Sequence, residues 1–309
     1  NDGSDPVQGT FGYKEGSLIF AGTDTFQISY VGGTGNDVTL TRVMADIWSG
    51  GAGAGDTNWS TAANWLGDVA PTAGDFLIFP DLTTQTIATN DYTSGMGFGG
   101  IMVVGNAYVL AGNSLILHGA LFNIGTNNTF DLPITLGDSL GIVNYGGDLK
   151  LSAINLDGHR LTLDAESYYG AISADGEISG AGDVIKTGSG RAILAAANTY
   201  SGTTQVNAGK LEVHNARALG ATNGSADSGT TVRDGGVLTL NGPFTFDNEM
   251  LIVGENGGSI ENIGSNVWTG NVHFGSYAQL QGYGDSLLFT GDLTSESYAQ
   301  ISASRVGLF

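Results

Sequence analysis

The chain has 309 residues, of which 51 are glycine and 5 are proline, and it contains no cysteine. Only 13% of the residues are charged, and the 30 acidic residues against 10 Lys and Arg give a formal net charge of −20. This composition excludes collagen and long helical proteins. It also excludes nucleic-acid binding through a basic surface, disulfide bonds and cysteine-based zinc sites.

Membrane insertion by this segment is not expected, because no apolar run approaches the ~18 residues of a spanning helix. An anionic membrane surface would also repel so acidic a chain. Hydrophobic residues make up 41% of the sequence, which is enough for a substantial core. The acidic, cysteine-free and glycine-rich composition fits an extracellular bacterial protein.

Short alternating strands recur along the chain, separated by turns rich in Gly, Asn and Asp. The clearest are LKL at 149–151, LTL at 161–163, AIL at 192–194, LEV at 211–213, LTL at 238–240, LIV at 251–253 and LLF at 287–289. Weaker examples lie between them, including VIK at 184–186. Short alternating strands with turn signals at this spacing predict an all-β fold.

Two all-β architectures suit this pattern, a closed sandwich or barrel and a stacked β-solenoid. The strands are very short, and their turns use residues that tolerate positive φ at tight corners. The pattern also continues from about residue 119 to 309 without the linker that a second closed domain would need. These features favour the solenoid, in which the leucines of each triplet point inward and residues such as Lys150 point outward.

A family resemblance lies in the stretch GAGDVIKTGSGRAILAAANTYSGTTQVNAGKLEVHNARALG at 180–220. The turn KTGSG at 186–190, then NTYSGTT at 198–204 and VNAG at 206–209, resembles the autotransporter-associated β-strand repeat of bacterial surface proteins. DGGVLTL at 234–240 resembles the next rung, so the repeat core covers 180–241. One departure is AAA at 195–197, where the family more often has Ser-Gly.

The same resemblance divides the chain into three parts. FQISYVGGTGNDVTL at 26–40 looks like the closing strands of a preceding repeat block, so 1–44 are expected to be such strands and a possible junction between subunits. WSGGAGAGDTNWSTAANW at 48–65 resembles the start of a new block, so 45–118 are expected to form an aromatic-rich start or cap. The solenoid rungs are expected at 119–309, in a segment cut from something longer.

The resemblance implies a right-handed parallel β-helix that is exported and exposed at the cell surface. No coil of a solenoid folds alone, and its end strands expose hydrogen-bonding edges. We therefore expect a non-catalytic structural or adhesive rod that associates head to tail with copies of itself or with adjacent repeat modules. Carbohydrate binding is one alternative, and a β-helix polysaccharide lyase or hydrolase is another.

One turn, GGTGND at 32–37, approaches the calcium-binding nonapeptide of β-roll proteins and makes Asn36 and Asp37 candidate calcium ligands. It occurs once, whereas calcium rolls share ligands between successive turns. A tight glycine turn that closes a hairpin explains the same residues. No other cofactor is expected.

The aromatic residues of the second part have two interpretations. Trp48, Trp59 and Trp65 could stack on sugar rings, with Asp56 and Asn58 close by in sequence. They could instead cap the apolar core at the end of the solenoid. We favour the cap.

No catalytic residue is predicted. The carboxylates form no local cluster, and the histidines at 118, 159, 214 and 273 show no metal-binding or triad spacing. A lyase would need a basic residue beside carboxylate-bound calcium. The basic residues of the repeat core region, Arg160, Lys186, Arg191, Lys210 and Arg217, are spaced singly, and we expect solvated side chains.

Overall fold

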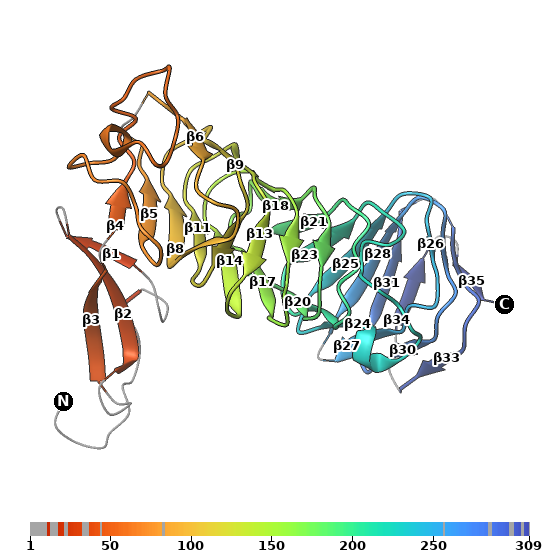
Figure 1. The fold of residues 1–309 in the computed structure, drawn as a ribbon. Helices are drawn as coiled ribbons and strands as arrows, with labels where there is room; N and C mark the ends of the chain where they lie inside the picture. The colour runs from red at the N-terminus through yellow and green to blue at the C-terminus, as the bar shows by residue number, and fades with distance from the viewer. Residues whose placement is uncertain are drawn as a thin grey trace.

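The chain folds into an elongated parallel β-solenoid that runs from β4 (Ala45–Ile47) to β35 (Val306–Leu308) (Figure 1). A computed structural model describes residues 11–12, 18–21, 24–32, 37–43, 45–81, 84–255, 257–283, 286–296, 300–303 and 306–308. In this described part, no helix is long and apolar enough to cross a membrane. The prediction of a stacked all-β fold is confirmed.

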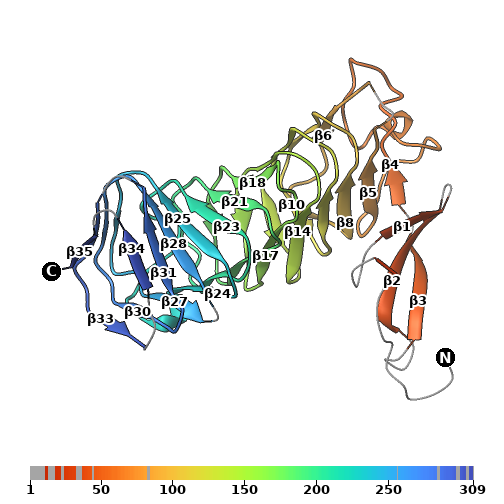
Figure 2. The same ribbon diagram turned by 180° about the vertical axis from the view of Figure 1, so that it is seen from behind.

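Two long parallel sheets form the first and second faces of the solenoid (Figure 2). The first face holds β4, β5 (Phe76–Phe79), β8 (Gly100–Val103), β11 (Leu121–Asn123), β14 (Leu140–Asn144), β17 (Leu161–Ala165), β20 (Val184–Thr187), β22 (Thr204–Val206), β24 (Thr230–Arg233), β27 (Leu251–Glu255), β30 (Val272–Phe274) and β33 (Leu293–Ser295). The second holds β6 (Ile87–Asn90), β9 (Val109–Gly112), β12 (Asn128–Asp131), β15 (Leu149–Leu151), β18 (Ala171–Ala174), β21 (Arg191–Leu194), β23 (Lys210–Val213), β25 (Val237–Asn241), β28 (Ser259–Ile263), β31 (Gln279–Gly282) and β34 (Gln300–Ala303).

The third face is divided into two shorter sheets. One holds β7 (Met96–Phe98), β10 (Leu115–Leu117), β13 (Ile134–Leu136), β16 (Ile154–Asn155) and β19 (Ile178–Ser179), and the other holds β26 (Thr245–Phe246), β29 (Asn266–Trp268), β32 (Leu287–Phe289) and β35. Between β19 and β26, residues 195–203 and 214–229 cross this face without a strand, and one short 3₁₀ turn, η2 (Ala226–Ser228), lies in the second crossing. The sequence did not predict this interruption.

The register of the first face shows how the rungs stack. Ile142 pairs with Leu121 and with Leu163, so these rungs are 21 residues long. Their side chains are fully buried, as expected for the inward positions of a strand with period two. The rung from Val206 to Val232 is 26 residues long and contains the second strandless crossing.

Buried asparagines help to join successive rungs. The Nδ2 of Asn123 donates to the Oδ1 of Asn144 at 2.8 Å, and the Nδ2 of Asn128 donates to the Oδ1 of Asn123 at 2.7 Å. All three side chains are at most 1% exposed. Burying a polar amide is costly unless it is hydrogen-bonded, and this ladder supplies the partners.

Stacked glycines explain part of the composition. A Cβ at Gly125 would overlap the carbonyl oxygen of Gly105 on the rung before it, and a Cβ at Gly146 would overlap that of Gly125. Each of these turns therefore needs glycine because the next rung lies against it, and not only for backbone freedom.

The N-terminal part holds a separate antiparallel sheet, β1 (Leu18–Ala21), β2 (Asp24–Gly32) and β3 (Asp37–Val43). In both ribbon views it stands beside the first rungs and not within the stack (Figures 1 and 2). The parallel ladder begins at β4, which pairs with β5. Residues 45–118 therefore build solenoid rungs as well as the aromatic end, so the ladder starts well before residue 119.

Candidate functional site

The three candidate tryptophans lie at the N-terminal end of the core. Trp48, Trp59 and Trp65 are each at most 1% exposed. The rings of Trp48 and Trp65 meet edge to face with centroids 5.3 Å apart, and all three tryptophans pack on Phe79. Their faces are covered by one another and by the core, so in this arrangement none presents a face on which a sugar could stack.

Polar groups hold the loop that carries these tryptophans. The indole N–H of Trp65 donates to the carbonyl of Trp59 at 2.7 Å, and that of Trp48 donates to the carbonyl of Gln85 at 2.9 Å. Asp56 accepts from the backbone N–H of Asn58 and from the hydroxyl of Thr61, and these bonds lower its pKa. The acidic and amide groups near the tryptophans therefore serve the loop itself. Here the short 3₁₀ turn η1 (Ala62–Asn64) contributes the buried Asn64.

The calcium candidate lies mostly outside the described residues. Asn36 is not described, and Asp37 is the first residue of β3. Among the residues that the structure does describe, no three His, Asp or Glu side chains are grouped so that they could hold a metal ion.

The histidines and basic residues are dispersed along the solenoid. His118 lies 3.1 Å from Asp138, and His214 lies 3.2 Å from Glu212. Glu212 also receives a hydrogen bond from Arg191 at 3.4 Å. These pairs link neighbouring residues or rungs. His118 and Asp138 are exposed, and a pair of this kind contributes little to stability, whereas Glu212 is buried.

Lys186 corrects the expectation of solvated basic side chains. Its side chain is fully buried, because Lys186 occupies the inward position that Leu163 fills one rung earlier. Its Nζ donates to the carbonyls of Thr187, Gly188 and Ala208, the last from the following rung. Burial lowers the pKa of Lys186 to about 8, although Asp164 and Glu166 act in the opposite direction. The Lys186 ammonium therefore joins the turns of two successive rungs by hydrogen bonds from inside the core.

Two carboxyl groups have raised pKa values, and they lie far apart along the rod. Burial, followed by the neighbouring Asp75, raises the pKa of Asp46 on β4 to about 6. Burial raises the pKa of Glu249 to about 8. Glu249 lies between β26 and β27, so the two groups cannot form the acid and base pair of a glycosidase.

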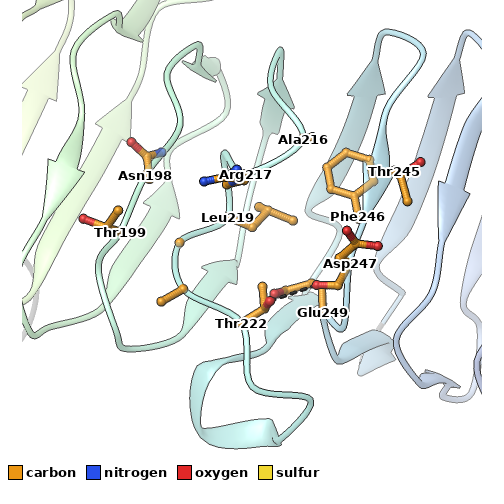
Figure 3. A pocket seen from close by; sticks show the side chains of 12 residues that line it. Asn198, Thr199, Ala216, Arg217, Leu219, Thr222, Thr245, Phe246, Asp247 and Glu249 are labelled. Carbon is orange, nitrogen blue, oxygen red and sulfur yellow. Dashed lines mark hydrogen bonds between the residues drawn. The ribbon is translucent and has the colours of Figure 1, made fainter.

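The interrupted third face contains a hollow of about 470 Å³. Figure 3 looks into it, with Asn198 and Thr199 on one side and Thr245, Phe246 and Asp247 on the other. Its floor includes the buried Leu219 and Phe246, whereas its rim carries exposed polar side chains. These rim residues are Thr199, Arg217, Thr222, Thr245 and Asp247.

Hydrogen bonds between rungs fix the walls of this hollow. The backbone N–H of Asn198 donates to the carbonyl of Arg217 at 2.9 Å, and its Nδ2 donates to the carbonyl of Ala218. The hydroxyl of Thr222 donates to the carbonyl of Asp247 at 2.8 Å. The strandless crossings are therefore held by specific contacts in place of a sheet.

Glu249 lies beside the floor of the hollow. Its side chain is 1% exposed, and its Oε1 accepts a hydrogen bond from Thr230 at 2.7 Å. Its Oε2 has no hydrogen-bond partner in the described part of the protein. Its backbone carbonyl accepts the indole N–H of Trp268 at 2.7 Å, which anchors the next rung.

Comparison with known proteins identifies the rungs beside this hollow. Residues 184–213 match the family described as the passenger-associated-transport-repeat. This stretch of the chain carries a passenger-associated-transport-repeat. The repeat spans β20 to β23, and it contains both Lys186 and the hollow's wall residues Asn198 and Thr199.

One relative supports the same assignment. The adhesin BmaC autotransporter of Brucella suis biovar 1 (strain 1330) is 30% identical over 137 residues, which cover 38% of this chain. The aligned part is 4% of that adhesin, so this chain corresponds to a small part of the relative's length. No solved structure matches the chain.

The sequence located the passenger repeat but missed the hollow and the buried lysine. Lys186 could have been found from the alternation of VIK at 184–186, because Val184 and Lys186 share the inward face. The hollow had no such signal. Its walls are crossings in which apolar and polar residues do not alternate, so the sequence pattern predicts no structure for them.

Proposed function

We propose that this chain is a non-catalytic part of an exported passenger, acting outside the cell as a rod that bears adhesive contacts. The observation that carries this proposal is the long parallel ladder of the first face, with its core of stacked inward side chains. Each rung of a solenoid is stabilised by its neighbours, so the ladder makes a stiff, extended body.

The passenger repeat and the relative named as an adhesin support the surface location and the adhesive role. The net charge of −20 is consistent with a rod that stays soluble outside the cell.

We further propose that the rods associate head to tail, with copies of themselves or with adjacent repeat modules. The supporting chemistry is that of a parallel ladder, because its edge strand presents unpaired N–H and C=O groups. In the described part of the chain, β33 and β34 hold the edge positions of their sheets, and β1–β3 form a sheet that is separate from the ladder. A strand from the N-terminal sheet of one subunit would then extend the ladder of the next by β-augmentation.

Electron microscopy of the purified chain tests this proposal, together with a variant that lacks residues 1–44. We expect filaments from the full chain and single rods from the variant. Circular dichroism and resistance to proteinase K under native conditions control for folding of the variant.

Three other outcomes are informative. Single rods from the full chain would overturn head-to-tail association but not the rod. Filaments from the variant would exclude the N-terminal sheet as the junction. Rapid native digestion of both proteins would contradict the rod itself.

A further inference from the structure

We propose that the hollow on the interrupted third face binds one uncharged hexose unit of a glycan. This site is separate from the buried tryptophans at the end of the core. It does not depend on head-to-tail association, because its walls come from residues 198–249 of a single chain.

The shape of the hollow is that of a small-ligand site. Its volume of about 470 Å³ lies in the range of pockets that hold small molecules, and a few polar groups surround an apolar floor. Leu219 and Phe246 lie beneath the floor and are at most 2% exposed, so the apolar surface that a ligand reaches comes from Ala216 and Ala221. A pyranose ring has one comparatively apolar face and a rim of hydroxyl groups, which matches this distribution.

The charges on the rim identify the ligand more closely. Within the described part of the chain, neither the Arg217 guanidinium nor the Asp247 carboxylate has a hydrogen-bond or ion-pair partner. Arg217 can only donate hydrogen bonds and ionised Asp247 can only accept them. A hydroxyl group both donates and accepts, so a polyhydroxylated ligand satisfies both side chains.

Charged ligands fit this rim less well. An anionic ligand would meet Asp247 and a chain of net charge −20, and a cationic ligand would meet Arg217. A neutral sugar avoids both repulsions. Thr199, Thr222 and Thr245 add hydroxyl groups around the same rim.

The site is held in place before a ligand arrives. Asn198 donates to the backbone carbonyl of Arg217, and Thr222 donates to that of Asp247, so each charged residue is anchored by the rung before it. Burial raises the pKa of Glu249 to about 8, so this carboxyl is mainly protonated at neutral pH and adds little negative charge beside the floor. Such preorganisation reduces the ordering that binding requires.

Saturation-transfer NMR on the full chain tests the site with methyl glycosides of glucose, galactose, mannose and N-acetylglucosamine as probes. We expect at least one of them to bind saturably. Arg217→Met and Asp247→Ala should each weaken its binding about tenfold, since each removes hydrogen bonds from a charged group. Ala221→Trp should abolish binding, because Ala221 lies exposed on the rim and the indole would occupy the hollow.

Arg160→Met is the matched control, since Arg160 is exposed on a different rung. Circular dichroism and thermal melting establish that each variant is folded. Glucuronate, acetate and trilysine are run as competing probes.

Three results would overturn the proposal. The first is that none of the neutral glycosides binds. The second is that Arg160→Met weakens binding as much as Arg217→Met does. The third is that glucuronate, acetate or trilysine binds more tightly than any neutral glycoside, which would assign the hollow to an ion or a peptide.

Discussion

Glu249 should make the stability of its rungs depend on pH. Its carboxyl is 1% exposed, and burial raises its pKa from 4.5 to about 8. Between these two values the folded chain holds a proton that the unfolded chain has lost. The contribution of Glu249 to stability is therefore largest below pH 4.5 and falls as the pH rises toward 8. A shift of one pKa unit corresponds to about 1.36 kcal/mol, which gives a loss of roughly 4 kcal/mol between about pH 5 and pH 9.

Glu249→Gln keeps the acceptor for the Thr230 hydroxyl but cannot ionise. The difference in stability between the variant and the natural chain should therefore change by roughly 4 kcal/mol across this pH range, in favour of the variant at high pH. Any constant cost of burying the amide cancels in that comparison. Other titrating groups, Asp46 and Lys186 among them, cancel as well.

Hydrogen exchange of the β24 and β27 amides measures this effect locally, because these strands flank Glu249 and their protection reports opening of its rungs. Asp247→Asn is the matched control, since it removes an exposed carboxylate two positions away. If protection in the natural chain and in Glu249→Gln changed in parallel with pH, Glu249 would not be the group responsible. The same conclusion would follow if Asp247→Asn had the same effect as Glu249→Gln.

Three further predictions concern the rungs and the cap. Gly125→Ala should destabilise the solenoid by about 2–4 kcal/mol in urea denaturation, because its Cβ would overlap the Gly105 carbonyl, whereas Gly53→Ala, at an open turn, should cost about 1 kcal/mol. Lys186→Met should cost about 2–4 kcal/mol at neutral pH, since three carbonyls lose their donor. Because the pKa of Lys186 is lowered, the unfolded chain binds more protons than the folded chain between pH 8 and 10.5, and stability should rise with pH in this range. Lys186→Met should remove that rise. An unchanged urea midpoint, or the same rise in the variant, would contradict this prediction. Trp65→Ala should cost about 3–5 kcal/mol and raise proteolysis within residues 49–75, whereas Tyr169→Ala, at a side chain that is 95% exposed, should have little effect on either measurement.

The two long faces of the solenoid could be predicted from the sequence because their chemistry is repetitive. In LKL at 149–151 the two leucines are buried and Lys150 is exposed, as the period of two requires. The register in which each rung pairs with the next could not be predicted from the local alternation alone. Leu149 pairs with Ile172, and that choice of partner depends on the length and turns of the whole intervening rung.

For Lys186, the expectation of a solvated side chain was wrong. Taken alone, a lysine beside Gly and Thr indicates a solvated turn. Its inward position follows from the alternation with Val184, and its pairing with Leu163 of the rung before it agrees with that position. The buried ammonium is then tolerated because three carbonyls at the corner accept from it.

The difference between the two long faces and the strandless crossings accounts for the position of the hollow. A residue on either long face must fit the rungs on both sides, so substitution there disturbs a ladder that supports the whole rod. The crossings at 195–203 and 214–229 have no strand pairing to preserve, and side-chain contacts from Asn198 and Thr222 hold them instead. Such a stretch can change its rim residues while the ladders beside it stay intact. A rod built in this way gains a binding site where its strand pairing is interrupted, and Arg217 and Asp247 lie there unpaired in the described part of the chain.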